Sequence, residues 1–209
     1  MTQNNMKPNK FHYLKSTCVP LPIENVDTDQ IIPARFLKAV TREGFGENLF
    51  RDWRYDSDDK PKKDFVLNDP RYKGEILVVG ENFGSGSSRE HAAWAIKDFG
   101  FKAVISSFFA DIFKNNALNN GLLVVEIPEE YLKELFETIE KDPQTCVEIN
   151  LENQDVFFAS KKLRINFDID PYKKMTIMKG FDDIDYLLSE QDKTKEFEKK
   201  RKDDYSLSF

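Results

Sequence analysis

The sequence has few of the residues that hold a protein together through covalent bonds or metal ions. Among 209 residues, only two are cysteines and two are histidines. Cys18 and Cys146 stand alone, without a CxxC pair or a neighbouring histidine, and we interpret them as reduced thiols rather than metal ligands. Two cysteines exclude a disulfide scaffold, 9 glycines exclude a collagen-like chain, and a 40% apolar content that includes 18 phenylalanines excludes a wholly disordered chain. A globular chain with one main domain is predicted.

The chain also lacks a positive net charge and a long apolar run. It has 31 Lys and Arg residues and 37 Asp and Glu residues, which gives a formal net charge of -6. A negative net charge does not attract the phosphate backbone of a nucleic acid. The longest apolar stretches, such as 76–79 and 122–125, are far too short to span a bilayer. Residues 1–10 are polar and have no apolar signal-peptide segment. We expect a cytoplasmic protein whose partners include neither nucleic acid nor a membrane.

Strand and helix patterns alternate through the middle of the chain. The expected strands are 11–19, 76–79, 103–107, 122–127, 145–151, 156–158 and 163–167, and the expected helices are 89–99, 109–119, 128–140 and 171–188. Strand, helix, strand, helix, strand between 76 and 127 indicates parallel pairing with right-handed crossovers. The predicted class is therefore α/β, with a parallel βαβ core and additional C-terminal strands.

The charge pattern suggests how the chain is divided. Ten of the fourteen residues from 51 to 64 are charged, so 41–74 is interpreted as a long charged and solvated loop, of the kind that forms lids, binding surfaces or disordered segments. Residues 189–209 are mostly charged as well and are expected to form a solvated tail. We expect an N-terminal extension over 1–10, one domain over 11–188 that contains the loop, and the tail.

A glycine- and serine-rich segment lies between the expected strand 76–79 and the helix that follows it. Residues 80–91 read GENFGSGSSREH. Its glycines allow a sharp turn and a close approach of a ligand to the backbone. The Ser87-x-x-Glu90 spacing predicts a capping box, with Ser87 or Ser88 at the helix N-terminus, where the backbone favours an anion. Arg89 adds a planar fork suited to a carboxylate. The pattern indicates a small-anion site, with an ordinary capped helix as the simpler alternative.

Familiar nucleotide and hydrolase motifs do not fit this segment. A dinucleotide fingerprint would need glycine in place of Arg89, and a phosphate-binding P-loop would need Gly-Lys-Ser or Gly-Lys-Thr. A nucleophile elbow needs a glycine two residues after the serine, which neither Ser87 nor Ser88 has. His12 and His91 are the only histidines for a hydrolytic triad, and His91 is interpreted as a packing residue inside the helix.

Two separate motifs resemble one known family. Residues 84–93 read GSGSSREHAA, which resembles the serine loop of the swivelling domain of the aconitase superfamily. Residues 26–37 read VDTDQIIPARFL, which is similar to the upstream signature of the stand-alone small subunits. Together they resemble the small subunits of 3-isopropylmalate dehydratase, from about residue 11 to residue 188. The resemblance implies a β/β/α swivelling domain, in agreement with the α/β class predicted above.

The resemblance also implies an activity and a set of site residues. The family's hydro-lyases interconvert 2-isopropylmalate and 3-isopropylmalate in leucine biosynthesis, by loss and re-addition of water through isopropylmaleate. By this resemblance Ser87 is the catalytic base in its alkoxide form, and Ser88, Arg89 and Arg35 bind substrate carboxylates, with Arg35 open to a second interpretation as a surface arginine. Asp29 is a candidate for orienting the serine or an arginine, or for capping a turn.

The resemblance implies that half of the site lies on another chain. A [4Fe-4S] cluster needs three or four thiolates, more than Cys18 and Cys146 provide, and the family carries it on a large subunit. We therefore expect no cofactor on this chain, a heterodimer with an iron-sulfur large subunit, and a small dicarboxylate substrate. Two alternatives are a small subunit of a related hydroxy-diacid hydratase of the homoaconitase or citraconate type, and a non-catalytic anion-binding module.

Overall fold

The computed structural model describes residues 10–37, 44–181, 183–189, 191, 194–195, 197–198 and 201. Residues 1–9 of the expected N-terminal extension and residues 41–43 of the expected charged loop lie outside this described part. Of the expected tail over 189–209, only 189, 191, 194–195, 197–198 and 201 are described.

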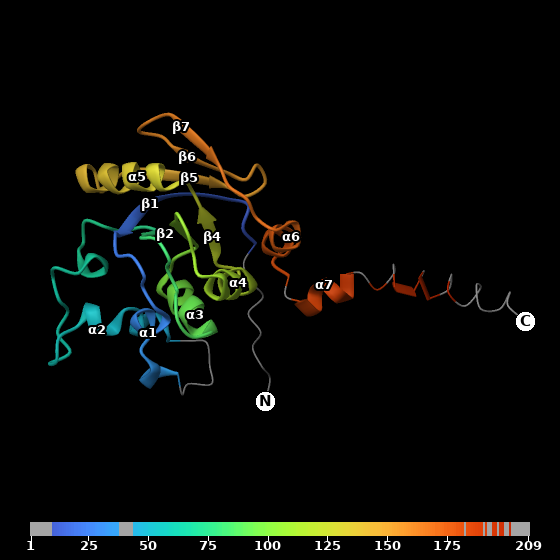
Figure 1. Ribbon diagram of the computed structural model, residues 1–209, viewed down its shortest axis with the longest axis horizontal. Coiled ribbons are helices and arrows are strands. Elements are labelled where there is room, and N and C mark those ends of the chain that lie inside the picture. Colours follow the sequence, from blue (N-terminus) through green and yellow to red (C-terminus); the bar gives the residue numbers. More distant parts are fainter. Residues whose placement is uncertain are drawn as a thin grey trace, which may run out of the picture.

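The described part is built on a seven-stranded sheet (Figure 1). The strands are β1 (Tyr13–Leu21), β2 (Ile76–Val79), β3 (Ala103–Ser106), β4 (Leu123–Glu126), β5 (Cys146–Asn150), β6 (Asp155–Phe158) and β7 (Leu163–Asn166). The α-helices are α1 (Thr28–Ile31), α2 (Arg51–Arg54), α3 (Glu90–Phe99), α4 (Asp111–Asn119), α5 (Glu129–Lys141), α6 (Pro171–Lys179) and α7 (Asp183–Ser189). Short 3₁₀ helices are η1 (Ala34–Phe36), η2 (Gly46–Asn48) and η3 (Val66–Asn68).

Strand β1 joins a parallel half of the sheet to an antiparallel half. The strand order is β4-β3-β2-β1-β5-β6-β7. The second part of β1 pairs in parallel with β2, from Cys18 opposite Ile76 onward, and its first part pairs antiparallel with β5. Strands β2 and β3 are buried at every position, whereas β5 alternates between buried and half-buried residues, as parallel and antiparallel strands usually do. The expected α/β class with a parallel βαβ core and additional C-terminal strands is confirmed.

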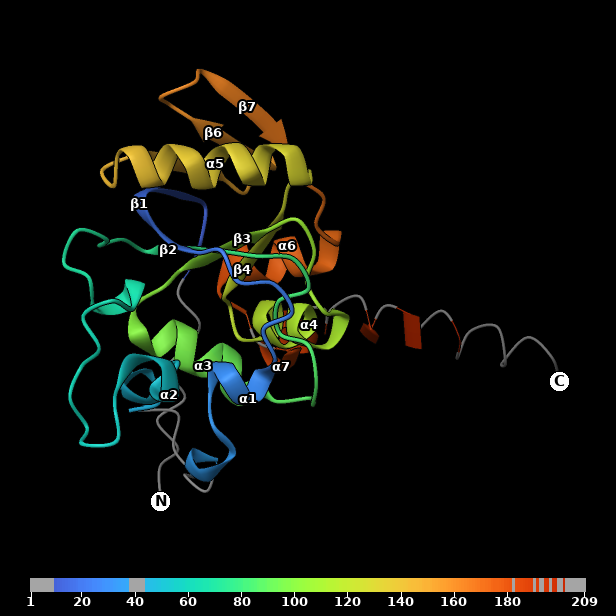
Figure 2. The same ribbon diagram turned by 60° about the vertical axis from the view of Figure 1, so that its left-hand side comes forward.

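Helices cover the parallel half of the sheet on both sides. In both views the parallel strands lie between α5 on one side and α3 with α4 on the other (Figures 1 and 2). Helix α5 buries Leu132, Leu135 and Ile139, the face that their helical spacing predicts. The short helix α1 lies beside α3 in both views. The segments that follow β1 and β2, which carry the two sequence motifs, therefore lie at one end of the parallel strands.

The single helix expected over 171–188 is two helices in the structure. Helix α6 ends at Gly180, which has a left-handed φ of 65°. The N–H of Phe181 donates to the carbonyl of Thr176 at 2.9 Å, which satisfies a carbonyl in the last turn. This is the common glycine C-cap that ends a helix. The periodic apolar pattern in the sequence therefore continues past the point where α6 ends.

The expectation of a solvated loop over 41–74 is wrong for residues 45–54. Phe45, Leu49 and Phe50 are buried in the main core, and η2 and α2 lie in this stretch. Arg54 is only 8% exposed and donates to the carbonyl of Leu49 at 3.2 Å, while its guanidinium lies 4.8 Å from the centre of the Phe99 ring. Turns of three or four residues are too short to produce a periodic pattern, which explains why the sequence did not reveal them.

Candidate active site

The two sequence motifs meet where β1 and β2 end. The N–H of Gly84 donates to the carbonyl of Val26 at 2.7 Å, and the N–H of Thr28 donates to the carbonyl of Ser85 at 2.9 Å. Asp27 and Ser85 form an isolated parallel bridge. Because parallel strands end at the same edge of a sheet, segments almost sixty residues apart in the chain become one layer of backbone. The site residues expected from the sequence are thus brought to one end of the fold.

A pair of asparagines ties the two segments together just before the motifs begin. Asn25 and Asn82 have left-handed φ values of 55° and 57°, a conformation that asparagine tolerates better than most residues. The side-chain amide of Asn82 donates to Oδ1 of Asn25 at 2.9 Å, and the N–H of Asn25 donates to the carbonyl of Glu81 at 2.8 Å. This pair fixes the distance between the two chain segments.

The serine loop turns at its two glycines, as the sequence predicts. Gly84 and Gly86 have φ values of 80° and 92°, in the left-handed region. A Cβ on Gly84 would lie 2.2 Å from Cγ of Phe113, whereas a Cβ on Gly86 would meet nothing closer than 3.5 Å. The first glycine is therefore required by both conformation and packing, and the second by conformation alone.

The capping box expected at Ser87 and Glu90 is not formed. Helix α3 begins at Glu90, and Arg89 is its N-cap residue, without a side-chain cap hydrogen bond. A capping box would need Glu90 to be the third helical residue, but here it is the first. Ser87 and Ser88 are exposed in the loop just before the helix, and the carbonyl of Ser87 accepts a hydrogen bond from Oγ1 of Thr28 at 3.1 Å. The side chains of both serines remain accessible to a ligand.

Asp29 pairs with the arginine of the serine loop. The capping role lies with Asp27, whose carboxylate accepts the N–H of Gln30 at 2.9 Å and completes a capping box on α1. Asp29 forms an ion pair with the guanidinium of Arg89. That hydrogen bond, helped by the backbone N–H of Ala34, holds the pKa of the Asp29 carboxyl below its ordinary value. The sequence left Asp29 as a residue that orients the serine or an arginine, or that caps a turn. The ion pair with Arg89 matches the orientation of an arginine.

Arg35 lies in η1, and its guanidinium points to a different partner. It forms a two-pronged ion pair with Asp52 of α2, in which Nη1 donates to Oδ2 at 3.0 Å and Nη2 contacts Oδ1. This hydrogen bonding raises the pKa of Arg35 and lowers the pKa of Asp52. Arg35 follows Ala34, whose backbone N–H contacts the Asp29 carboxylate, but the ion pair of Arg35 itself is with Asp52 of α2, outside the serine loop.

His91 packs against aromatic rings, as interpreted from the sequence. Its ring centre lies 4.6 Å from that of Trp94 and 5.4 Å from that of Phe45. Burial among these rings lowers the pKa of His91, so the imidazole is neutral at neutral pH. The geometry gives this histidine a packing role between α3 and the start of the 44–74 segment.

The residues of this chain do not fit an iron-sulfur cluster. Cys18 is buried in β1, Cys146 is half-buried in β5, and two thiols are fewer than a cubane cluster requires. Within the described residues, no group of three or more His, Cys, Asp or Glu side chains is arranged to hold a metal ion. Over the same residues, no helix combines the length and the apolar character that crossing a membrane requires.

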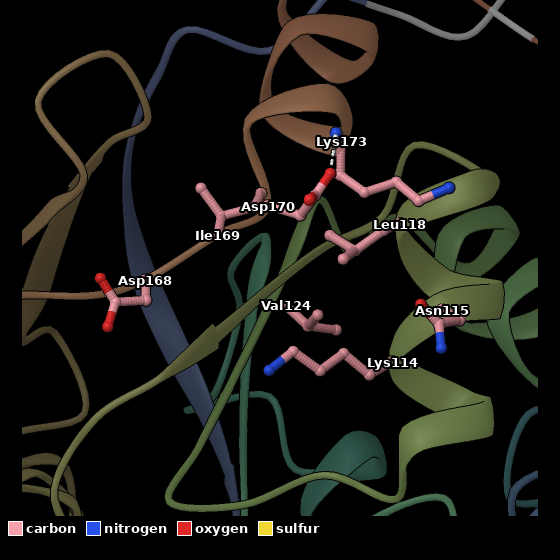
Figure 3. A pocket seen from close by; sticks show the side chains of 8 residues that line it. All are labelled: Lys114, Asn115, Leu118, Val124, Asp168, Ile169, Asp170 and Lys173. Carbon is pink, nitrogen blue, oxygen red and sulfur yellow. Dashed lines mark hydrogen bonds between the residues drawn. The ribbon is translucent and has the colours of Figure 1, made fainter.

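A cavity of about 520 Å³ lies away from the two motifs, between α4, β4 and the start of α6 (Figure 3). It is lined by Lys114, Asn115, Leu118, Val124, Asp168, Ile169, Asp170 and Lys173. Several of its polar groups are already engaged: Lys114 pairs with Glu126 at 2.6 Å, and the Asp170 carboxylate accepts the N–H of Lys173 at 3.0 Å. It includes no site residue expected from the sequence, and we assign the candidate site to the serine loop.

Asp52, Asn25 and Asn82 were not predicted from the sequence. Asp52 lies in a run of charges where nothing distinguishes one carboxylate from the next, so the sequence carries no signal for it. An asparagine just before each motif is a usable signal, since asparagine favours left-handed turns.

Comparison with known proteins adds three kinds of match. The aconitase C-terminal domain family matches residues 8–130. The chain is 61% identical over 193 residues to the 3-isopropylmalate dehydratase small subunit of Christiangramia forsetii, covering 92% of this chain and 94% of the relative. It is 49% identical to the protein of the same name from Thermobifida fusca, covering 92% and 95%. The crystal structure of 3-isopropylmalate dehydratase from Methanocaldococcus jannaschii matches with a TM-score of 0.62 at 29% identity, covering 90% of this chain and 99% of that one.

Proposed function

Because the chain belongs to the aconitase C-terminal domain family, and within it to the 3-isopropylmalate dehydratase small subunits, we propose that it supplies one half of a divided hydro-lyase site. In the complex with its large subunit, it interconverts 2-isopropylmalate and 3-isopropylmalate in leucine biosynthesis. The unit that does so is the domain over 11–188, acting in the cytoplasm. The large subunit carries the [4Fe-4S] cluster, because this chain has too few thiols to hold one.

Ser87 is the base in this proposal. Its alkoxide removes the proton from the carbon next to a substrate carboxylate, and the electron pair of that C–H bond forms the double bond of isopropylmaleate. The hydroxyl group on the neighbouring carbon leaves with its own bonding electrons. Re-addition of water with the opposite regiochemistry gives the isomer. The N-terminus of α3 and the guanidinium of Arg89 favour a negative charge on Ser87, which a free serine could not sustain.

Ser88, Arg89 and Arg35 bind the substrate carboxylates. The Arg89 guanidinium has more N–H donors than Asp29 takes up, so it can hold a carboxylate while Asp29 orients it. Arg35 similarly retains donors beyond those in contact with Asp52. The two arginines have partners on different segments, Asp29 on α1 and Asp52 on α2. This separation suits a substrate with two carboxylates.

The observation that carries the proposal is the meeting of the two motifs at the end of β1 and β2. Asp29 of the first motif pairs with Arg89 of the second, and Thr28 contacts the backbone of Ser87. A helix that was merely capped after a glycine turn would not need an arginine held by a carboxylate from another segment. An exposed serine next to a helix N-terminus and an oriented arginine is the arrangement that proton abstraction beside a carboxylate requires.

The test is the Ser87→Ala variant, assayed with a large subunit. Because a general base contributes roughly 10² to 10⁴-fold, turnover should fall by at least about 100-fold. Ser160→Ala is the matched control, since Ser160 is exposed between β6 and β7 and should leave turnover unchanged. Size-exclusion chromatography should show both variants in the complex. Turnover of Ser87→Ala within about threefold of the wild type would reject Ser87 as the base.

The substrate assignment has its own test. A panel of branched and linear hydroxy-diacids should show the highest kcat/KM for the isopropylmalates. A preference for homocitrate-type or citramalate-type diacids would contradict the assignment while leaving the role of Ser87 intact.

A further inference from the structure

Asp52 of α2 holds the guanidinium of Arg35 at both of its terminal nitrogens. We propose that Asp52 is a positioning residue, which fixes the guanidinium of Arg35 so that its remaining N–H groups face a substrate carboxylate. The inference rests on the proposed function, because it takes Arg35 as a substrate-binding residue.

The contact between the two side chains is end-on. Nη1 of Arg35 donates to Oδ2 of Asp52 at 3.0 Å, and Nη2 contacts Oδ1. This geometry uses one N–H on each terminal nitrogen and leaves the Nε–H and the second N–H of each terminal nitrogen for another acceptor. The guanidinium also lies 4.6 Å from the centre of the Phe36 ring. Asp52 can therefore hold Arg35 in one plane without occupying the side-on edge that binds a carboxylate.

Asp52 is itself held by a buried framework. The N–H of Phe50, just before α2, donates to the carbonyl of Ile31 in α1 at 2.8 Å. At the other end of α2, buried Arg54 anchors the helix by donating to the carbonyl of Leu49 at 3.2 Å. The backbone of Asp52 accepts from Nζ of Lys62 at 3.0 Å. Since α1 also carries Asp29, the carboxylates that hold Arg35 and Arg89 are fixed on one connected frame.

The energetics predict an effect on substrate binding rather than on folding. The side chains of Arg35 and Asp52 are 54% and 60% exposed, and exposed ion pairs contribute little to stability. A free arginine side chain must instead be ordered when the substrate binds, and the cost of ordering one long side chain corresponds to roughly a 3- to 10-fold loss of affinity. Asp52→Asn should therefore raise KM by about that factor and change kcat by less than about twofold.

The experiment is a double-mutant cycle in the complex with the large subunit. It compares the wild type, Asp52→Asn, Arg35→Ala and the double variant, by KM and kcat for 3-isopropylmalate. Asp58→Asn is the control, because it removes the same charge from the same segment and Asp58 pairs only weakly, at 3.3 Å, with exposed Lys60. Asp52→Asn should raise KM in the wild-type background and leave it unchanged in the Arg35→Ala background.

A second measurement does not depend on activity. In the isolated chain, the Nη protons of Arg35 should give separate NMR signals while Asp52 restrains the guanidinium, and these signals should merge in Asp52→Asn but not in Asp58→Asn. Merged signals in the wild type, or an equal rise in KM in both backgrounds of the cycle, would overturn the proposal. A fall in KM would also overturn it, by showing that Asp52 competes with the substrate. A wild-type complex without isomerase turnover, but with the NMR difference intact, would contradict the proposed function and leave the positioning contact standing.

Discussion

The two glycines of the serine loop offer a matched pair of substitutions. Gly84→Ala and Gly86→Ala each place a Cβ on a residue with left-handed φ, which costs roughly 1 to 2 kcal/mol in either case. Only at Gly84 would the new Cβ overlap a buried side chain, at 2.2 Å from Cγ of Phe113. Phe113 is 1% exposed and cannot move into solvent, so overpacking adds a further cost of roughly 1 to 3 kcal/mol. The free energy of unfolding should therefore fall by about 2 to 5 kcal/mol in Gly84→Ala and by about 1 to 2 kcal/mol in Gly86→Ala.

Urea unfolding of the isolated chain measures this difference directly. Both variants should show the wild-type m-value, with the midpoint of Gly84→Ala clearly below that of Gly86→Ala. The thermal midpoints should follow the same order, because each kcal/mol lowers Tm by roughly 2 to 4 °C in a chain of this size. Equal losses in the two variants would refute the packing argument and show that backbone strain alone decides the loop's glycine requirement. A stable Gly84→Ala would contradict the described position of Phe113.

Three further predictions follow from the contacts around the loop. Arg89→Lys should raise KM by about tenfold or more in steady-state assays, because a point charge cannot make a forked carboxylate contact; unchanged kinetics would leave Arg89 only a helix-start residue. Asn82→Ala should lower stability in urea by roughly 1 to 2 kcal/mol, since alanine is strained at its left-handed φ; no loss would argue against the asparagine pair as a fixed contact. The Arg89 ion pair lowers the pKa of Asp29, so its stabilisation is present above the unfolded pKa of about 3.9 and is lost as pH falls through the lower folded value. Because Asp29 is 53% exposed, Asp29→Asn should lower the free energy of unfolding by less than about 1 kcal/mol at neutral pH. The loss should disappear at a pH below the folded pKa of Asp29, measured by urea unfolding at a series of pH values. A loss that grows as pH falls would contradict this prediction.

The parallel core could be predicted from the sequence because its signals are local. Strands β2 and β3 are short apolar runs buried at every position, and α5 places its apolar residues at helical spacing. The start of α3 was expected at residue 89 and lies at Glu90, but the expected capping box was wrong, because Ser87 and Glu90 have capping-box spacing whether or not Ser87 is the N-cap residue. The break at Gly180 had a signal, a glycine within the expected helix, but the apolar periodicity outweighed it.

The turn that carries the candidate site was predictable from the sequence, but the contacts of the candidate site residues were not. The glycine turn follows from residue types within one segment. The pairing of Asp29 with Arg89, and of Arg35 with Asp52, depends on how α1, α2 and the serine loop are stacked, and no local pattern encodes that. The buried part of the 44–74 segment is a similar case, because its short helices are held together by Arg54, which donates to the backbone carbonyls of Glu47 and Leu49.

In the proposed divided site, this chain holds the base and lacks the group that activates the departing hydroxyl. The decisive measurement is isomerase turnover for the chain alone and after titration with a cluster-bearing large subunit, under anaerobic conditions with iron and sulfide. The chain alone should stay colourless and inactive, because two thiols cannot ligate a cubane cluster. Turnover should appear on mixing and rise in proportion to the complex formed. Cluster absorbance or isomerase turnover in the isolated chain would contradict the divided site.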